Sequence, residues 1–158
     1  MILKFKSNDE FLELLKKINE KYYECLNANI LYLEELEDKI YINYLLELRD
    51  AYSHLVRVLG GDLFSPKNKK NVLNHLRMYV SHLQNGLLNS FQKIISLEIK
   101  SIKKCLSRNN VKLVEYQIAL KAHQLRIMSN DISIDKKIDR YKSLLFYISD
   151  IRKKFHLE

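Results

Sequence analysis

Hydrophobic residues recur every three or four positions along most of the chain, and this spacing predicts helices. Ser7–Glu10 reads S-N-D-E, a capping box that begins the first helix. That helix reaches about Asn27, and 27–29 either breaks or kinks the chain. Its apolar positions are Phe11, Leu14, Leu15, Ile18, Tyr22 and Leu26. No segment alternates with a period of two, so we expect an all-α fold.

The same periodicity predicts the later helices. It continues from Ile30 to Leu59, with Asp38-Lys39 as a second candidate break, and Gly60-Gly61 ends it. After a linker containing the only proline, further helices are expected at 69–106 and 111–128, followed by one capped by Asp131 or Ser133. The last helix has an apolar stripe of Ile138, Tyr141, Leu145, Ile148, Ile151 and Phe155.

The prediction is therefore an antiparallel bundle of about five helices, in which helices two and three form a long hairpin. Residues 1–156 are expected to form a single domain, since this length suits one hydrophobic core. The final Leu157-Glu158 is interpreted as a remnant of an expression vector.

One phrase occurs twice in this hairpin. Residues 48–55 read LRDAYSHL and residues 76–83 read LRMYVSHL, 28 positions later. An offset of 28 is four heptads, so both copies present the same face when both are helical. The alternative is a coincidence of heptad spacing in an ordinary helical hairpin.

A helical wheel assigns faces to the two helices. The residues predicted to face inward are Leu45, Leu48, Tyr52, Leu55 and Leu59 on helix two, and Leu73, Leu76, Val80, Leu83 and Leu87 on helix three. The opposite flank carries Arg49, Asp50, Ser53, His54 and Arg57, and then Arg77, Ser81, His82 and Asn85. The hairpin places Asp50 opposite roughly Met78, so Arg49, His54, Arg77 and His82 are expected within about two turns of a local two-fold axis. His75 and His123 show no interpretable pattern.

Charge and cysteine content narrow the functional classes. The 27 Lys and Arg against 19 Asp and Glu leave a net charge of +8, which suits a polyanion such as RNA or simply a lysine-rich surface. Cys25 and Cys105 lack metal-ligand spacing and are expected to be buried free thiols. Without a membrane span or signal peptide in the sequence, we expect a cytoplasmic protein that does not contact membranes.

At residues 49–54, the chain resembles HEPN domains. Arg49-Asp50-Ala51-Tyr52-Ser53-His54 matches their Arg-polar-x-x-x-His signature, and the resemblance covers about residues 36–100. HEPN domains are all-helical and include many metal-independent ribonucleases of toxin and phage-defence systems. The resemblance implies a homodimer, with an RNA-cleaving site where two copies of the motif meet, and no metal or cofactor.

The resemblance also implies roles for particular residues. His54 would act as general base or acid, Arg49 would stabilise charge on the phosphate, and Asp50 would fix the tautomer of His54. Arg77, His82, Ser53 and Arg57 would form a secondary site. The RNA backbone would be held by Lys67, Lys69, Lys70, Lys103, Lys104 and Arg108.

Other interpretations remain open from the residues alone. His54 and Arg49 also suit an ordinary solvent-facing flank, where Asp50 with His54 and Ser53 with Arg57 are i,i+4 surface pairs. The chain would then be a non-catalytic helical interaction module, such as an adaptor, an antitoxin-like partner or an inhibitor bound to a cognate protein. A basic nucleic-acid-binding protein without cleavage is a further alternative.

Overall fold

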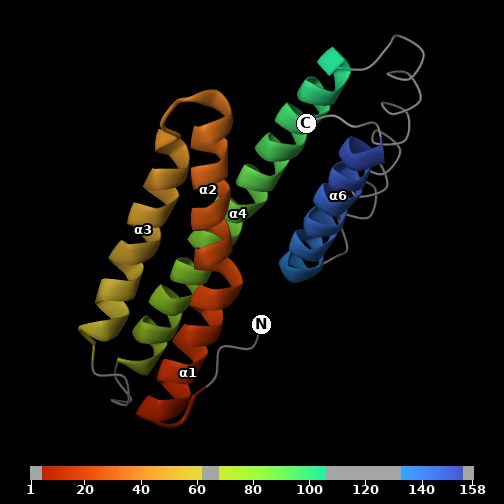
Figure 1. The fold of residues 1–158 in the computed structure, drawn as a ribbon. Coiled ribbons are helices and arrows are strands. Elements are labelled where there is room, and N and C mark those ends of the chain that lie inside the picture. Colours follow the sequence, from red (N-terminus) through yellow and green to blue (C-terminus); the bar gives the residue numbers. More distant parts are fainter. Residues whose placement is uncertain (1–4, 62–67, 106–132, 155–158) are drawn as a thin grey trace. The chain divides into compact units, whose positions relative to one another are not determined.

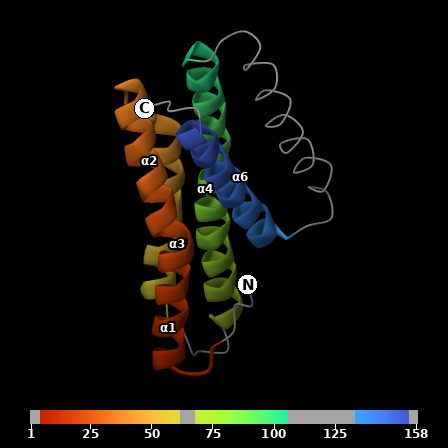
Figure 2. The same cartoon turned by 45° about the vertical axis from the view of Figure 1, so that its right-hand side comes forward.

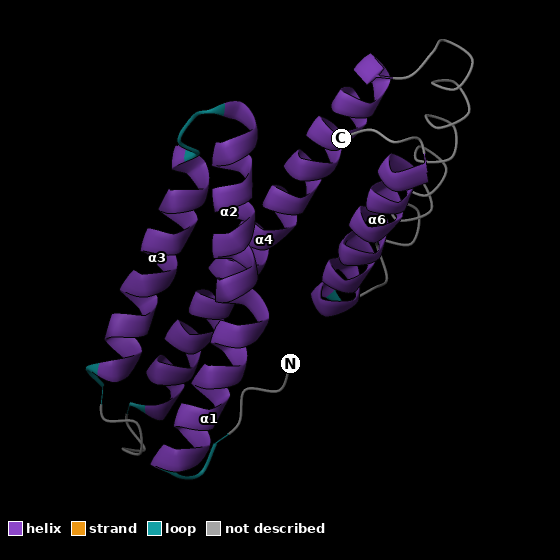
Figure 3. Ribbon diagram, viewed as in Figure 1, coloured by secondary structure: helices purple, strands orange, loops and turns teal. Residues whose placement is uncertain are grey.

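The structure, a computed structural model, describes residues 5–61, 68–105 and 133–154. These ranges are helical apart from short caps and turns, and they contain no strand, which confirms the all-α prediction (Figure 3). In chain order the elements are α1 (Asn8–Ile18), the π-helix η1 (Asn19–Tyr23), α2 (Glu24–Glu37), α3 (Ile42–Leu59), α4 (Lys69–Cys105) and α6 (Ile134–Lys154). The helix predicted at 111–128 lies outside the described residues.

The chain divides into two compact units, Met1–Ser90 and Phe91–Glu158. The long helix α4, predicted as one uninterrupted helix, contributes its first part to one unit and its last part to the other. Each unit has buried apolar residues of its own, and the single domain over 1–156 stays a prediction.

In the first unit, α1, η1 and α2 run on from one another without a break (Figures 1 and 2). Ser7 caps α1 as predicted: its hydroxyl accepts a hydrogen bond from the Glu10 backbone N–H, whereas the Glu10 carboxylate accepts one from Lys6 N, one residue before the cap. The chain stays helical through 27–29. The helix α2 ends at Glu37, and the next residue, Asp38, adopts a left-handed conformation with φ 48°. The second candidate break is therefore the real one.

The π-helix explains how one face of this long segment stays buried. Four residues spaced four apart are all buried: Ile18, Tyr22, Leu26 and Ile30. In an ideal α-helix of 3.6 residues per turn, side chains with this spacing would shift steadily around the helix and away from the core. The wider i→i+5 turn at Asn19–Tyr23 absorbs part of the drift, so the same side keeps facing the core.

Side-chain contacts fix the directions of the helices in the first unit. Asn19 accepts a hydrogen bond from the Tyr79 hydroxyl, and Asn29 donates to Ser90 at 2.8 Å, so η1–α2 and α4 run parallel. The α3 helix packs against α4 and runs in the opposite direction: its Tyr44 hydroxyl donates to the Asn89 carbonyl, whereas its His54 contacts His75. The predicted hairpin of helices two and three is thus α3 with the first part of α4.

The face that α3 buries differs from the predicted one. Leu45, Tyr52 and Leu59 were expected inside, yet their side chains are 41%, 43% and 56% exposed. The fully buried residues are Ala51 and Val58, roughly a quarter turn around the helix. The rotation follows from a close approach: a Cβ on Gly86 of α4 would lie 3.3 Å from the Glu47 Cβ and 2.9 Å from a Leu26 methyl. On α4, the predicted inward residues Leu76, Val80, Leu83 and Leu87 are buried.

The second unit packs the last part of α4 against α6. Its core consists of Ile95, Ile102, Leu144, Ile148 and Ile151. The Phe91 and Tyr141 rings stack with centroids 6.2 Å apart, and further along Arg152 pairs with the buried Glu98 at 2.7 Å, so the two helices run parallel. Ser133 caps α6, as one of the two predicted caps, by accepting a hydrogen bond from Lys136 N.

Two further expectations concern the surface. Neither Cys25 nor Cys105 is part of a disulfide; Cys25 is half-buried, and Cys105 is exposed, so the prediction that Cys105 is buried is wrong. None of the helices in the described ranges combines the length and the apolar character that a membrane span requires.

The contact at Gly86 generates a stability prediction. Gly86→Val should lower the free energy of unfolding by about 1–3 kcal/mol, because the added methyl groups enter a space already filled by Leu26 and Glu47. The measurement is urea denaturation followed by circular dichroism. Asn85→Val, at the exposed neighbouring position, is the control and should change stability far less. Equal effects of both substitutions would contradict the close packing at residue 86.

Candidate functional site

Polar side chains line the inner face of α3 where it meets α4. The His82 Nδ1 lies 2.8 Å from a Glu47 carboxylate oxygen, and the His54 Nδ1 lies 2.9 Å from the His75 Nδ1. Glu47 and His54 are seven residues apart on α3, and so are His75 and His82 on α4. Because the helices are antiparallel, the two pairs face each other in reverse order. We call these four residues the histidine layer.

The three imidazole rings of the histidine layer are in close contact. The His54 ring stacks on His82, with centroids 5.5 Å apart and an angle of 16° between the planes, and its centroid is 5.2 Å from that of His75. All four residues are partly buried. Only one of the facing Nδ1 atoms of His54 and His75 can carry the shared proton, so at most one of them donates in this contact.

The environment favours a neutral His54. Burial lowers the pKa of His54 below its ordinary value of 6.5, and the positive charges that His75, His82 and Arg57 can carry lower it further. The Asp50 carboxylate acts in the opposite direction and more weakly. A neutral imidazole keeps one ring nitrogen that can accept a proton.

The structure brings His54 and His82 together, as the two-fold relation of the repeated phrase predicted, but it leaves Arg49 elsewhere. Arg49 is five residues before His54, about 140° around α3, so the two side chains leave the helix on different sides. The exposed Arg49 guanidinium donates to a single Asp50 oxygen, from Nε at 2.9 Å and from Nη2 at 2.7 Å. Asp50 therefore pairs with Arg49, and the hydrogen bond at His54 Nδ1 involves His75.

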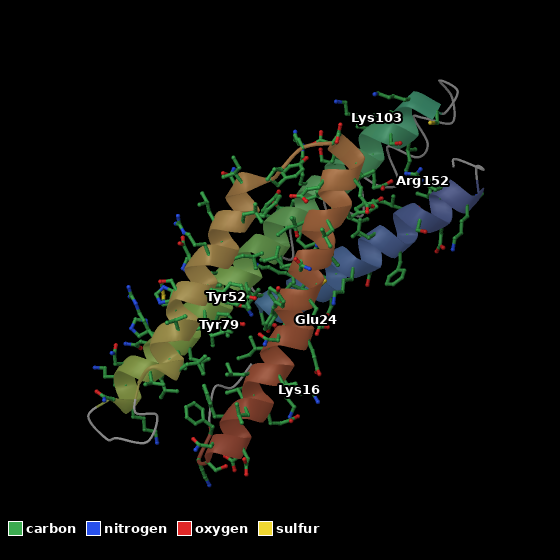
Figure 4. All side chains as sticks on the ribbon, turned by 60° about the vertical axis from the view of Figure 1, so that its left-hand side comes forward. Lys16, Glu24, Tyr52, Tyr79, Lys103 and Arg152 are labelled. Carbon is green, nitrogen blue, oxygen red and sulfur yellow. The ribbon has the colours of Figure 1, made fainter. Side chains whose placement is uncertain are left out.

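The remaining predicted site residues are spread over the surface. Ser53 and Arg57 are exposed on α3, and the exposed Arg77 contacts the Asn74 amide oxygen on its own helix. Lys69 and Lys70 lie at the start of α4, whereas Lys103 and Lys104 lie at its far end and in the other unit (Figure 4 labels Lys103). Lys67 and Arg108 lie outside the described residues. Neither unit thus gathers these predicted RNA-binding residues into one described patch.

A second feature lies on the outer side of α3. The residues Ile42, Leu45, Arg49, Tyr52, Val56 and Leu59 are all exposed and follow one another at separations of three, four, three, four and three. This is the spacing of the a and d positions of a heptad repeat, and it aligns the six side chains on one stripe. We call this stripe the α3 seam. Five of its six residues are apolar or aromatic, and Val56 is 66% exposed.

The aromatic residue of the α3 seam is held in place from inside the unit. The Tyr52 ring meets the Tyr23 ring edge-on, with centroids 5.8 Å apart and 70° between the planes. Burial, followed by a hydrogen bond with Tyr23, raises the pKa of the Tyr52 hydroxyl, so Tyr52 is an uncharged phenol at neutral pH. Figure 4 labels Tyr52 on α3 and Tyr79 on α4; burial raises the pKa of Tyr79 to about 12.

Glu47 and His75 are the members of the histidine layer that the sequence did not single out. The sequence signal that could have identified them is spacing: Glu47 lies seven residues before His54, and His75 lies seven residues before His82. In an antiparallel hairpin, this equal spacing places the two pairs opposite each other. The described residues contain no group of three or more histidine, cysteine, aspartate or glutamate side chains arranged to hold a metal ion. The sequence matches no protein-family model, no curated protein and no solved structure.

The lowered pKa of His54 generates a pH prediction. Because the unfolded chain binds a proton at His54 more readily than the folded chain, stability should fall as the pH drops through 6.5 and continue to fall until the folded pKa is reached. In His54→Gln this contribution is absent, so the loss of unfolding free energy between neutral and mildly acidic pH should be smaller than in the wild type. Urea denaturation at both pH values measures it, and an unchanged loss in His54→Gln would contradict a neutral, buried His54.

Proposed function

We propose that the protein is a non-catalytic helical interaction module that works by pairing with a second copy through the α3 seam. The observation that carries this proposal is a heptad stripe of apolar side chains, three turns or more in length, that the described residues leave open to solvent. In a monomer, such a stripe would expose clustered hydrophobic surface, and a partner helix removes that surface from water.

The packing of α3 supports this proposal. A helix that turns Ala51 and Val58 inward and leaves Leu45, Val56 and Leu59 outside has two apolar faces. One face contacts its own unit and the other suits a second helix. Isolated exposed apolar residues are ordinary in soluble proteins, but six positions with a regular heptad spacing are characteristic of a helix–helix interface.

This proposal predicts a dimer that depends on the α3 seam. Sedimentation velocity at about 1–100 µM protein should show a species of twice the 18.9 kDa monomer mass. Val56→Glu should shift the protein to monomer, because it places a carboxylate in an apolar part of the contact. Leu12→Glu is the matched control: Leu12 is 59% exposed and belongs to α1 and not to the seam, so this variant should remain dimeric. A wild-type protein that is monomeric throughout would refute the proposal.

A second candidate function is the HEPN-like ribonuclease, favoured by the contact between His54 and His82. Two partly exposed imidazoles 5.5 Å apart can supply a base for the 2′-hydroxyl and an acid for the leaving 5′-oxygen of RNA. In this candidate, Arg49 and Arg77 lie outside the histidine layer. They would bind RNA phosphates, either in their own subunit or at the site of a second copy.

Incubation with labelled RNA in EDTA tests the second candidate. The ribonuclease candidate predicts cleavage by the wild type and a loss of roughly 100-fold or more in His54→Gln, with folding retained. Leu12→Glu, remote from the histidine layer, is the control for a contaminating nuclease and should cleave as the wild type does. If His54→Gln cleaves at the wild-type rate, or if the wild type does not cleave, the ribonuclease candidate is excluded and the interaction module stands alone.

A further inference from the structure

We infer that two copies of α3 pair in antiparallel orientation, and that Arg49 selects this orientation by packing against Tyr52 of the partner subunit. The inference rests on the proposed function and adds to it the direction, the register and the residue that specifies both.

The spacing of the α3 seam is the first argument. Read in either direction, the separations between its six residues are three, four, three, four and three. A two-fold axis between residues 50 and 51 therefore superimposes the stripe on itself, which is the condition for an isologous contact. The axis pairs Ile42 with the partner's Leu59, Leu45 with the partner's Val56, and Arg49 with the partner's Tyr52. Each a position then meets a d position, and the two outer pairs are entirely apolar.

Charge is the second argument. A parallel pair in the same register would place Arg49 against Arg49 of the partner subunit in the centre of the contact, where two like charges repel. The antiparallel pair offsets the two guanidinium groups by three residues, about 4.5 Å along the axis, and places each against an aromatic ring, whose negative face attracts it. One polar residue at an a position is a known device for specifying the register of a helix pair, and Arg49 is the only charged residue of the α3 seam.

Both side chains are already held in suitable positions. The Arg49 guanidinium donates two hydrogen bonds to one Asp50 oxygen, which restricts its position and leaves its planar face open to a partner ring. The Tyr23 ring supports Tyr52 edge-on, which limits the rotamers that pairing would otherwise have to restrict. The aliphatic part of an arginine can be buried in such a contact while its guanidinium stays hydrated.

The size of the contact sets its strength. The six residues span 17 helical steps, from residue 42 to residue 59, or about 26 Å of helix. Two helices in contact over this length bury an area at the small end of specific interfaces, so the dimer should dissociate on dilution. The occupant is a second copy because the stripe is complementary to itself in spacing and in charge.

Disulfide trapping tests the orientation in the full chain, with Cys25 and Cys105 replaced by serine so that only introduced thiols react. In the double variant Leu45→Cys with Val56→Cys, mild oxidation should give covalent dimers, because the antiparallel register brings these positions together. Leu45→Cys alone should give almost none, because the two copies of residue 45 would be 11 residues, about 16 Å, apart. Retained helicity and a retained sedimentation dimer check the fold of each variant.

Arg49→Leu tests the cause of the orientation. Without the charge, the parallel register loses its repulsion, so trapping by Leu45→Cys alone should rise severalfold in the Arg49→Leu background. The lysine variant Arg49→Lys retains the charge and should retain the wild-type trapping pattern.

The outcomes separate this inference from the proposed function. A sedimentation dimer that is trapped efficiently by Leu45→Cys alone would overturn the antiparallel orientation and leave the pairing module in place. An Arg49→Leu protein that stays purely antiparallel would overturn the role of Arg49. A protein that is monomeric at every concentration would overturn the proposed function itself, as would pairing that occurs only with a different protein.

Discussion

Leu26 of α2, Glu47 of α3 and Gly86 of α4 meet where a side chain larger than hydrogen at residue 86 would collide with both neighbours. The three helices approach one another so closely here that residue 86 has no room for a Cβ atom. The contact fixes how far α3 is rotated about its own axis, because Glu47 has to lie over Gly86. The inner and outer features of α3 both follow from that rotation.

On the inner side, the rotation directs side chains from successive turns of α3 toward α4. Glu47 contacts His82, Ala51 is fully buried one turn further on, and His54 contacts His75 and His82. A polar layer in a helical interface is tolerated because its members satisfy one another. The layer gives the hairpin a defined register, since a shift by one turn would separate Glu47 from His82 and leave a partly buried carboxylate without this partner.

On the outer side, the same rotation turns a regular apolar stripe to solvent. The two copies of the repeated phrase are therefore not equivalent in the fold. In the second copy, Leu76 and Leu83 are fully buried in the core of the unit, whereas in the first copy Leu48 and Leu55 are only partly buried and Tyr52 and Leu59 are exposed. The two copies have similar sequences but different environments. The copy on α4 contributes to the core of the unit, and the copy on α3 leaves an apolar face exposed to solvent. This asymmetry leaves the α3 seam exposed on one helix while the corresponding part of α4 is buried.

Local features of the sequence were sufficient to determine much of the fold. The Ser7 capping box, the end of α3 at Gly60-Gly61 and the 3.6-residue periodicity predicted where most described helices begin and end, because these signals act between neighbouring residues. The pairing of the hairpin, with its two repeated histidines in contact, also followed from a short connection between two helices. Only the tertiary structure decided which side of α3 is buried. Apolar residues cover so wide an arc of that helix that several rotations satisfy its pattern, and the choice among them depended on the space at Gly86, contributed by a different helix. The tertiary structure also decided the contacts of Glu47 with His82 and of His75 with His54. Each of these contacts joins α3 to α4, so neither helix alone predicts it.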